Sequence, residues 1–348
     1  MRAPFVFAAL VVATLTLPGA LALLTLDDGG AVLDAQVAGV GAVAGLTKGD
    51  FLVGYKEGQE EAALLAVQLA GGTVRRVQHD LRLAEVEAAD AQSFTATVVV
   101  SPSVEYAESN GPVLLNGAQW NGAEWNGAEW NGAEWNGAEW NGAQWNGAQW
   151  NGAQWNGAHN APASANDPGR FLQWGLAAAQ VPPAWATHPG ERRAHLCVID
   201  SGVDWTHRDL AENVWTGPGG THGYNAVNDS LYPFDDAGHG THVAGIAAAA
   251  VTNGWGVAGV GNVQVMAAKV LDANGAGTEA DLAFGVAWCA NAGADVALMA
   301  LSASEPGPAL DRALDYAAAR GVLLVASAGN DGPSSGVAYP ARHPAVMA

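Results

Sequence analysis

Two hydrophobic patterns alternate along the chain from residue 194 onward. Short uninterrupted apolar runs predict buried strands, and the segments between them carry apolar residues at helical spacing. The strands are predicted at 194–200, 263–271, 295–301 and 322–328. Strands that alternate with helices in this way are typical of a doubly wound, mostly parallel α/β sheet with helices on both faces. In such a sheet, ligands gather at the carboxyl ends of the strands.

A smaller unit at residues 50–111 has a different pattern. D-F-L-V-G-Y-K reads as a strand, and the helix after it ends at Gly71-Gly72. T-V-R-R-V follows as a strand, A-D-A-Q-S-F begins a second helix, and V-E-Y-A-E-S-N forms a last strand. This order predicts a small α+β domain that precedes the larger sheet.

The N-terminus has the pattern of an export signal. Met1-Arg2 is followed by a short apolar run and by P-G-A-L-A, with small residues at the cleavage positions. The run is short for a membrane span. We therefore expect residues 1–22 to be a cleaved signal peptide and the protein to be secreted, with no stable membrane span after cleavage.

A repeat with a period of five residues fills the segment between the two predicted domains, 116–160. Eight copies of N-G-A-(Q/E)-W carry eight of the 14 tryptophans. A Gly/Asn-rich linker is one interpretation, and a sticky or carbohydrate-binding tether is another. Shifted in frame, the copies are also similar to the units of pentapeptide-repeat β-helices.

The net charge excludes one class of partner. At −20, it argues against nucleic acid, because nucleic-acid binding needs a basic surface. Cys197 lies in an apolar strand and Cys289 in a helical pattern. Export permits a disulfide, but two cysteines do not make a disulfide framework, so two buried free thiols are the preferred interpretation.

Three polar residues lie where the strand rule places a site. Asp200 ends the first strand in V-I-D-S-G-V-D, His239 opens a helix in G-H-G-T-H-V-A-G, and Asn330 follows the last strand in A-S-A-G-N-D-G. Each alone could be an ordinary turn or cap residue. Together they are the types that a serine hydrolase needs: a carboxylate to orient an imidazole, a general base, and an amide that donates to an oxyanion.

A metal site at His239 and His242 is the weaker interpretation. Zinc-binding helices place histidines four residues apart with a glutamate between them, whereas these two are three apart with Gly and Thr between. No matching third ligand stands out.

The three motifs resemble those of the subtilisin-like serine proteases (subtilases, peptidase family S8), with greatest similarity to the thermitase-like branch. The resemblance extends over 166–348. It implies a secreted serine endopeptidase that acts on proteins or peptides, in which Asp200 orients the histidine, His239 is the general base and Asn330 donates to the oxyanion. His242 is then the second histidine of its motif and supports helix packing.

Residues 50–111 resemble the family's inhibitory propeptide of the I9 type, a small ferredoxin-like domain. The resemblance implies that this domain is a folding chaperone and intramolecular inhibitor. Since the tryptophan repeat follows it, the maturation site could lie near Asn110 or within 161–166.

The same resemblance implies substrate-binding residues. Ala300-Leu301-Ser302 is similar to the edge strand that pairs with the substrate backbone, and Ala328-Gly329 would form part of another wall of the primary pocket. It also implies a structural calcium site at Asp167, Asp209 and Asn253, whose oxygen donors suit this ion. No organic cofactor is expected.

One catalytic part is missing from the 348 residues. The family's nucleophile lies in G-T-S-M-A, and no G-T-S occurs here; Ser334 and Ser335 lie in a loop-like G-P-S-S-G. We therefore expect a C-terminally truncated subtilase that cannot hydrolyse peptides. The alternative is an inactive subtilase-derived surface or carbohydrate-binding protein that uses the tryptophan repeat.

Overall fold

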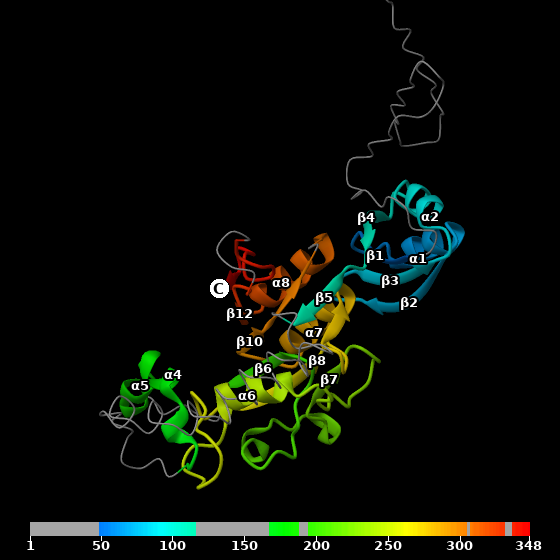
Figure 1. The fold of residues 1–348 in the computed structure, drawn as a ribbon. Helices are drawn as coiled ribbons and strands as arrows, with labels where there is room; N and C mark the ends of the chain where they lie inside the picture. The colour runs from blue at the N-terminus through cyan, green and yellow to red at the C-terminus, as the bar shows by residue number, and fades with distance from the viewer. Residues whose placement is uncertain (1–48, 116–166, 188–193, 305–306, 331–335) are drawn as a thin grey trace, which may run out of the picture. The chain divides into compact units, whose positions relative to one another are not determined.

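A computed structural model describes residues 49–115, 167–187, 194–304, 307–330 and 336–348 (Figure 1). The chain forms two compact units, Met1–Asn110 and Gly111–Ala348. The predicted signal peptide and the tryptophan repeat lie outside the described residues. No helix within the described ranges is long and apolar enough to cross a membrane.

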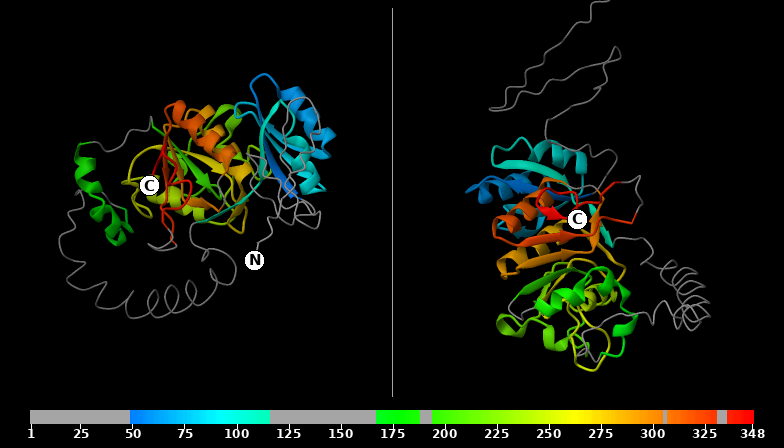
Figure 2. Two further views of the ribbon diagram at one scale, coloured as in Figure 1. Left: turned by 90° about the horizontal axis from the view of Figure 1, so that it is seen from above. Right: turned by 90° about the vertical axis from the view of Figure 1, so that its left-hand side faces the viewer.

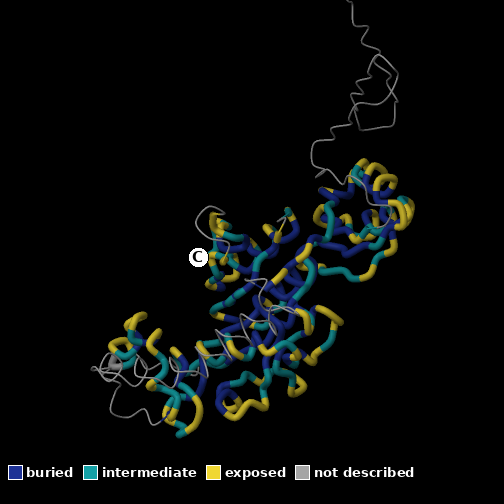
Figure 3. The backbone as a smooth tube through the Cα atoms, viewed as in Figure 1, coloured by how far each residue is buried: buried dark blue, intermediate teal, exposed yellow. Residues whose placement is uncertain are grey.

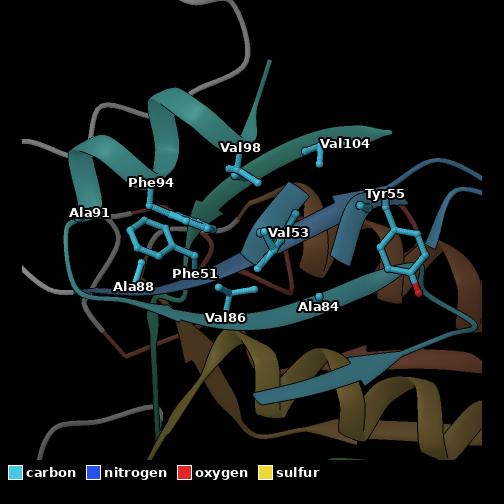
Figure 4. Close-up of a cluster of buried hydrophobic side chains, with 13 residues drawn as sticks. Phe51, Val53, Tyr55, Ala84, Val86, Ala88, Ala91, Phe94, Val98 and Val104 are labelled. Atoms are coloured by element: carbon cyan, nitrogen blue, oxygen red, sulfur yellow. The ribbon is translucent and has the colours of Figure 1, made fainter. Parts of the chain in front are cut away.

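The first unit has the β-α-β-β-α-β order of the ferredoxin-like domain that the propeptide resemblance implied. Its antiparallel sheet has the strand order β2-β3-β1-β4. The elements are β1 (Gly49–Tyr55), α1 (Glu60–Leu69), β2 (Gly72–Gln78), β3 (Leu83–Ala88), α2 (Ala91–Val98) and β4 (Val104–Ser109). Both helices place apolar side chains on one face of the sheet, where the rings of Phe51 and Phe94 lie 5.0 Å apart (Figure 4). Strand β3 was not predicted from the sequence.

The second unit is built on a six-stranded sheet in which every strand pair is parallel, as predicted. Its order is β13-β12-β10-β6-β8-β7. The strands are β6 (His195–Asp200), β7 (Gly223–Asn225), β8 (Gln264–Lys269), β10 (Val296–Met299), β12 (Leu323–Ala326) and β13 (Val346–Met347). The alternating crossovers confirm the α/β class.

Helices cover both faces of this sheet. Ala244 and Ala248 of α6 (His239–Ala248) pack on one face against Val198 of β6 and Val265 of β8. Helix α7 (Glu279–Asn291) lies on the other face and is almost wholly buried (Figure 3). Helix α8 (Pro308–Ala319) lies beside α7 in Figure 1.

The remaining helical segments lie at the periphery. Helices α4 (Trp174–Ala178) and α5 (Val181–Thr187) stand away from the sheet in the left view of Figure 2. Leu176 and Val181 pack against Ala258 in the loop before β8. The short 3-10 helices are η2 (Arg170–Leu172), η3 (Ala211–Asn213) and η4 (Pro218–Gly220).

The preference for two free thiols was wrong. Cys197 of β6 and Cys289 of α7 form a disulfide, with their Cα atoms 6.0 Å apart. Both residues are fully buried. The pairing arises because α7 packs directly over β6 and turns Cys289 toward the strand, which a one-dimensional apolar pattern does not reveal.

Candidate active site

Strand β6 delivers Asp200 to the carboxyl edge of the sheet. Its buried residues end at this aspartate, whose side chain is 0% exposed. In the parallel register, Asp200 lies opposite Lys269 at the end of β8. The Asp200 carbonyl accepts the backbone N–H of Val270 at 2.8 Å, which closes the ladder at this edge.

Helix α6 begins at the same edge with His239. The residue before it, Gly238, has a φ of 89°, in the left-handed region that favours glycine. The residue after it, Gly240, packs against the strand end so closely that a Cβ would lie 2.0 Å from the carbonyl oxygen of Gly202. Glycine at this position therefore lets the first turn of the helix approach the end of β6.

The structure brings two of the three predicted catalytic residues into direct contact. His239 Nδ1 lies 2.8 Å from Oδ1 and 2.9 Å from Oδ2 of Asp200. His239 is only 7% exposed. A carboxylate that accepts the Nδ1 proton fixes the tautomer in which Nε2 is free of hydrogen, and Nε2 can then accept a proton.

Asn330 lies at the same edge of the sheet. It follows β12, which is parallel to β10 and through it to β6, so the carboxyl ends of these strands share one edge. Its side chain is exposed. The preceding Ala328 and Gly329 form a turn that is fixed by the Ala338 N–H, which donates to the Ala328 carbonyl at 2.8 Å. The oxyanion role of Asn330 stays a prediction.

The predicted substrate-binding segment borders a second, small antiparallel sheet. Strand β11 (Leu301–Ala303) begins directly after Ala300, and the sheet order is β11-β5-β9. The central strand β5 (Pro112–Leu115) pairs on its other side with β9 (Ala276–Thr278). Leu115 lies opposite Leu301 and Leu114 opposite Ser302, so β11 pairs with an extended segment of its own chain. The binding of substrate at Ala300, Leu301 and Ser302 stays a prediction.

Side chains of β5 alternate between burial and exposure. Val113 is 0% and Leu115 5% exposed, whereas Pro112 and Leu114 face outward. The carbonyl of Gly111 also accepts the backbone N–H of Glu279 at 2.8 Å. Strand β5 was not predicted, because four residues next to the repeat carry too short a pattern.

Family models match two parts of the chain. The subtilase family (Peptidase S8) matches residues 192–348, and the fervidolysin N-terminal prodomain matches residues 33–110. Residues 192–348 belong to the subtilase family. The match includes Asp200, His239 and Asn330, and the prodomain match includes all four strands of the first unit.

Individual relatives agree with this assignment. The chain is 40% identical over 166 residues to a thermophilic serine proteinase of Bacillus sp. (strain AK1), which covers 47% of this chain and 40% of that protein. It is 38% identical over 186 residues to the halolysin-like extracellular serine protease Nep of Natrialba magadii. This alignment covers 53% of this chain and 34% of that protein. These matches span less than half the length of either relative.

A solved structure shares the fold. The crystal structure of fervidolysin from Fervidobacterium pennivorans, a keratinolytic enzyme related to subtilisin, aligns with a TM-score of 0.63 at 22% sequence identity. The alignment covers 87% of this chain and 43% of that chain.

The three predicted calcium ligands, Asp167, Asp209 and Asn253, lie close together. Each side-chain oxygen of Asp167, Asp209 and Asn253 accepts an N–H hydrogen bond. The donors, at 2.7–3.3 Å, are the backbone amides of Thr252, Asn253, Gly254, Trp255 and Val257 and the Asn253 side chain. Asn253 turns its NH2 group toward Asp209. The calcium site stays a prediction.

Within the described ranges, no three His, Cys, Asp or Glu side chains gather closely enough to bind a metal ion. His242 faces a cavity of about 440 Å³ beside α6. Burial, and secondarily repulsion from His239, lowers the pKa of His242 below its usual value.

Sequence analysis missed two charged residues beside the Asp–His pair. Lys269 is 4% exposed, and its Nζ donates to the carbonyls of Ser201 and Leu271 and to Asp236 at 2.6–2.8 Å. Asp235, 7% exposed, contacts both the strand end and the helix start. The sequence signal for Asp235 was the pair of aspartates, Asp235 and Asp236, shortly before His239. Only the fold shows that Asp235 is the buried one of the two.

Proposed function

We propose that this chain supplies the Asp–His half of a secreted serine endopeptidase of the subtilisin type. The observation that carries the proposal is the buried contact between His239 Nδ1 and both carboxylate oxygens of Asp200. Asp200 orients the ring and stabilises the imidazolium, and His239 Nε2 takes the proton of the attacking hydroxyl. Asn330 donates to the oxygen that becomes negative in the tetrahedral intermediate.

The nucleophilic serine has to come from outside these 348 residues. None of the serines near Asn330 lies in a G-T-S context. The chain by itself therefore hydrolyses no peptide, because without a nucleophile the base has no hydroxyl to activate. In subtilisin itself, loss of the nucleophile lowers kcat by about 10⁶.

Substrates of the complete site are proteins or peptides bound in extended form. The edge of β11 offers main-chain donors and acceptors, so a substrate adds a strand to it. Strand β5 already takes this place between β11 and β9. Strand β5, which directly follows the prodomain, therefore blocks this edge, and a substrate has to displace β5 before it can bind there.

The first experiment reads the coding DNA beyond the codon for Ala348. A frame that continues into a G-T-S motif supplies the nucleophile, and that longer product should hydrolyse casein and be blocked by a serine-directed covalent inhibitor. A verified stop codon would exclude a triad protease.

Variants of the longer product test the roles. Asp200→Asn and His239→Ala should each lower kcat by about 10⁴-fold or more, with the 348-residue chain as the inactive control. Hydrolysis that survives His239→Ala, or that ignores the inhibitor, would refute the proposal.

A further inference from the structure

The helix that carries His239 begins without a capping side chain of its own. Its N-cap is Gly238, which has no side chain to accept the N–H groups of the first turn. These N–H groups have no partner inside the helix and need acceptors elsewhere. The catalytic histidine is the first residue after this N-cap, so whatever binds these N–H groups also determines where its ring lies.

Asp235 supplies the missing cap from three residues upstream. Its Oδ2 accepts the backbone N–H of Thr241 at 2.8 Å and the Thr241 hydroxyl at 2.5 Å. Its Oδ1 accepts the backbone N–H groups of Ala237 and Gly238 at 3.1 and 2.8 Å. A carboxylate at the positive end of the helix dipole is favourable as well.

The same carboxylate ties the helix to the end of β6. Asp235 Oδ1 accepts the hydroxyl of Ser201 at 2.8 Å, and the oxygen of that hydroxyl accepts the Gly240 N–H at 2.9 Å. On the other side, the Thr241 hydroxyl accepts the backbone N–H of Asp204 at 2.9 Å while it donates to Asp235. Each hydroxyl donates once and accepts once, so the hydrogen directions of the network are consistent.

We propose that Asp235 is a positioning residue that sets the Asp200–His239 hydrogen bond, an inference that rests on the proposed function. His239 lies between Gly238, which Asp235 binds directly, and Gly240, which Asp235 holds through Ser201. Both chain neighbours of the histidine are therefore anchored to the strand end that carries Asp200. Without this anchor, two glycines leave the first turn free to shift, and the Nδ1 contact lengthens.

The test is a proton NMR measurement on the 348-residue chain. The His239 Nδ1 proton, bound to a carboxylate, should give a far-downfield resonance, which is assigned by its loss in His239→Gln. In Asp235→Asn, the NH2 group cannot accept from Thr241, and we expect this resonance to disappear or to exchange with water at least tenfold faster.

Asp236→Asn is the matched control. It removes the same charge one residue away, but Asp236 is half-exposed and contacts Lys269 and not the helix. The other charged or titratable groups around the pair, Asp200, His242 and Lys269, are unchanged in both variants. The resonance should persist in Asp236→Asn. This result would show that the hydrogen bonds of Asp235 to the helix, and not the loss of one negative charge, determine the resonance.

A second pair of variants covers the case in which Asp235→Asn does not fold. Thr241→Val removes the hydroxyl that links Asp235 to Asp204, and Thr241→Ser retains it. We expect faster exchange in the valine variant and wild-type exchange in the serine variant. A folded Asp235→Asn with an unchanged resonance, or equal exchange in the two Thr241 variants, overturns this inference alone. Absence of the resonance in the wild-type chain overturns the Asp–His pair and the proposed function with it.

Discussion

Removal of the disulfide should cost this chain much of its stability. The bond joins residues 92 positions apart, and both are fully buried in the core between β6 and α7. The loop-entropy relation gives about 4–5 kcal/mol for a closed loop of this length, and measured effects of native disulfides are typically about 2–4 kcal/mol. Since whole domains are stable by only about 5–15 kcal/mol, the double variant Cys197→Ala/Cys289→Ala should lose a large part of the total.

Urea unfolding of the wild type and the double variant measures this difference. The buried sulfurs are inaccessible to reductant in the folded chain, so the double variant is a better probe than added dithiothreitol. In an independent assay, the wild-type chain is unfolded in urea without reductant, and iodoacetamide is added to alkylate any free thiol. We expect no alkylated cysteine. Two alkylated cysteines, or a loss of stability below about 1 kcal/mol, would refute the reasoning.

Three further outcomes follow from the surroundings of the Asp–His pair. Gly240→Ala places a Cβ 2.0 Å from the Gly202 carbonyl oxygen and should destabilise the fold by about 2–3 kcal/mol. Gly245→Ala on the same helix meets nothing within 4 Å and should be neutral or stabilising by up to about 1 kcal/mol; equal effects in urea unfolding would contradict the close approach. Lys269→Met leaves two buried carbonyls without their donor and should cost about 2–4 kcal/mol, also measured by urea unfolding, with no such loss expected for a surface lysine. Because the pKa of His242 is lowered in the folded state, the unfolded chain binds the proton first as the pH falls. The stability that His242 contributes is present above the unfolded-state pKa near 6.5 and is lost as the pH falls through the folded-state pKa. In His242→Gln, the free energy of unfolding should therefore fall less on acidification than in the wild type. An unchanged pH profile would show that His242 does not cause this loss.

The local pattern of apolar residues in the sequence predicted most of the strands and helices. The apolar runs that end at Asp200 and Ala326 are long and uninterrupted, so they predicted parallel strands and the edge at which Asp200, His239 and Asn330 lie. In the first unit, the patterns predicted every element except β3, and the ferredoxin-like fold was implied by the family resemblance. The catalytic types could be read from their motifs because strand ends and helix starts are local features.

Contacts between distant segments were decided only by the tertiary structure. The Cys197–Cys289 bond depends on which face of α7 meets β6, and a helix that is apolar on nearly all sides gives no indication of its rotation. The N-terminal cap of α6 comes from Asp235, outside the helix, because Gly238 has no side chain. Strand β5 is ordered by two partners that lie more than 150 residues after it.

The calcium prediction shows the same division. The family resemblance placed the oxygen-bearing side chains of Asp167, Asp209 and Asn253 at one site, and hydrogen bonds connect the three residues in the structure. The loop backbone decides which atoms face one another, because the N–H groups of Thr252 and Val257 donate to Asp167 and Asp209. Sequence determines which chemical groups are available and in which elements they lie, whereas packing decides the direction in which each group points.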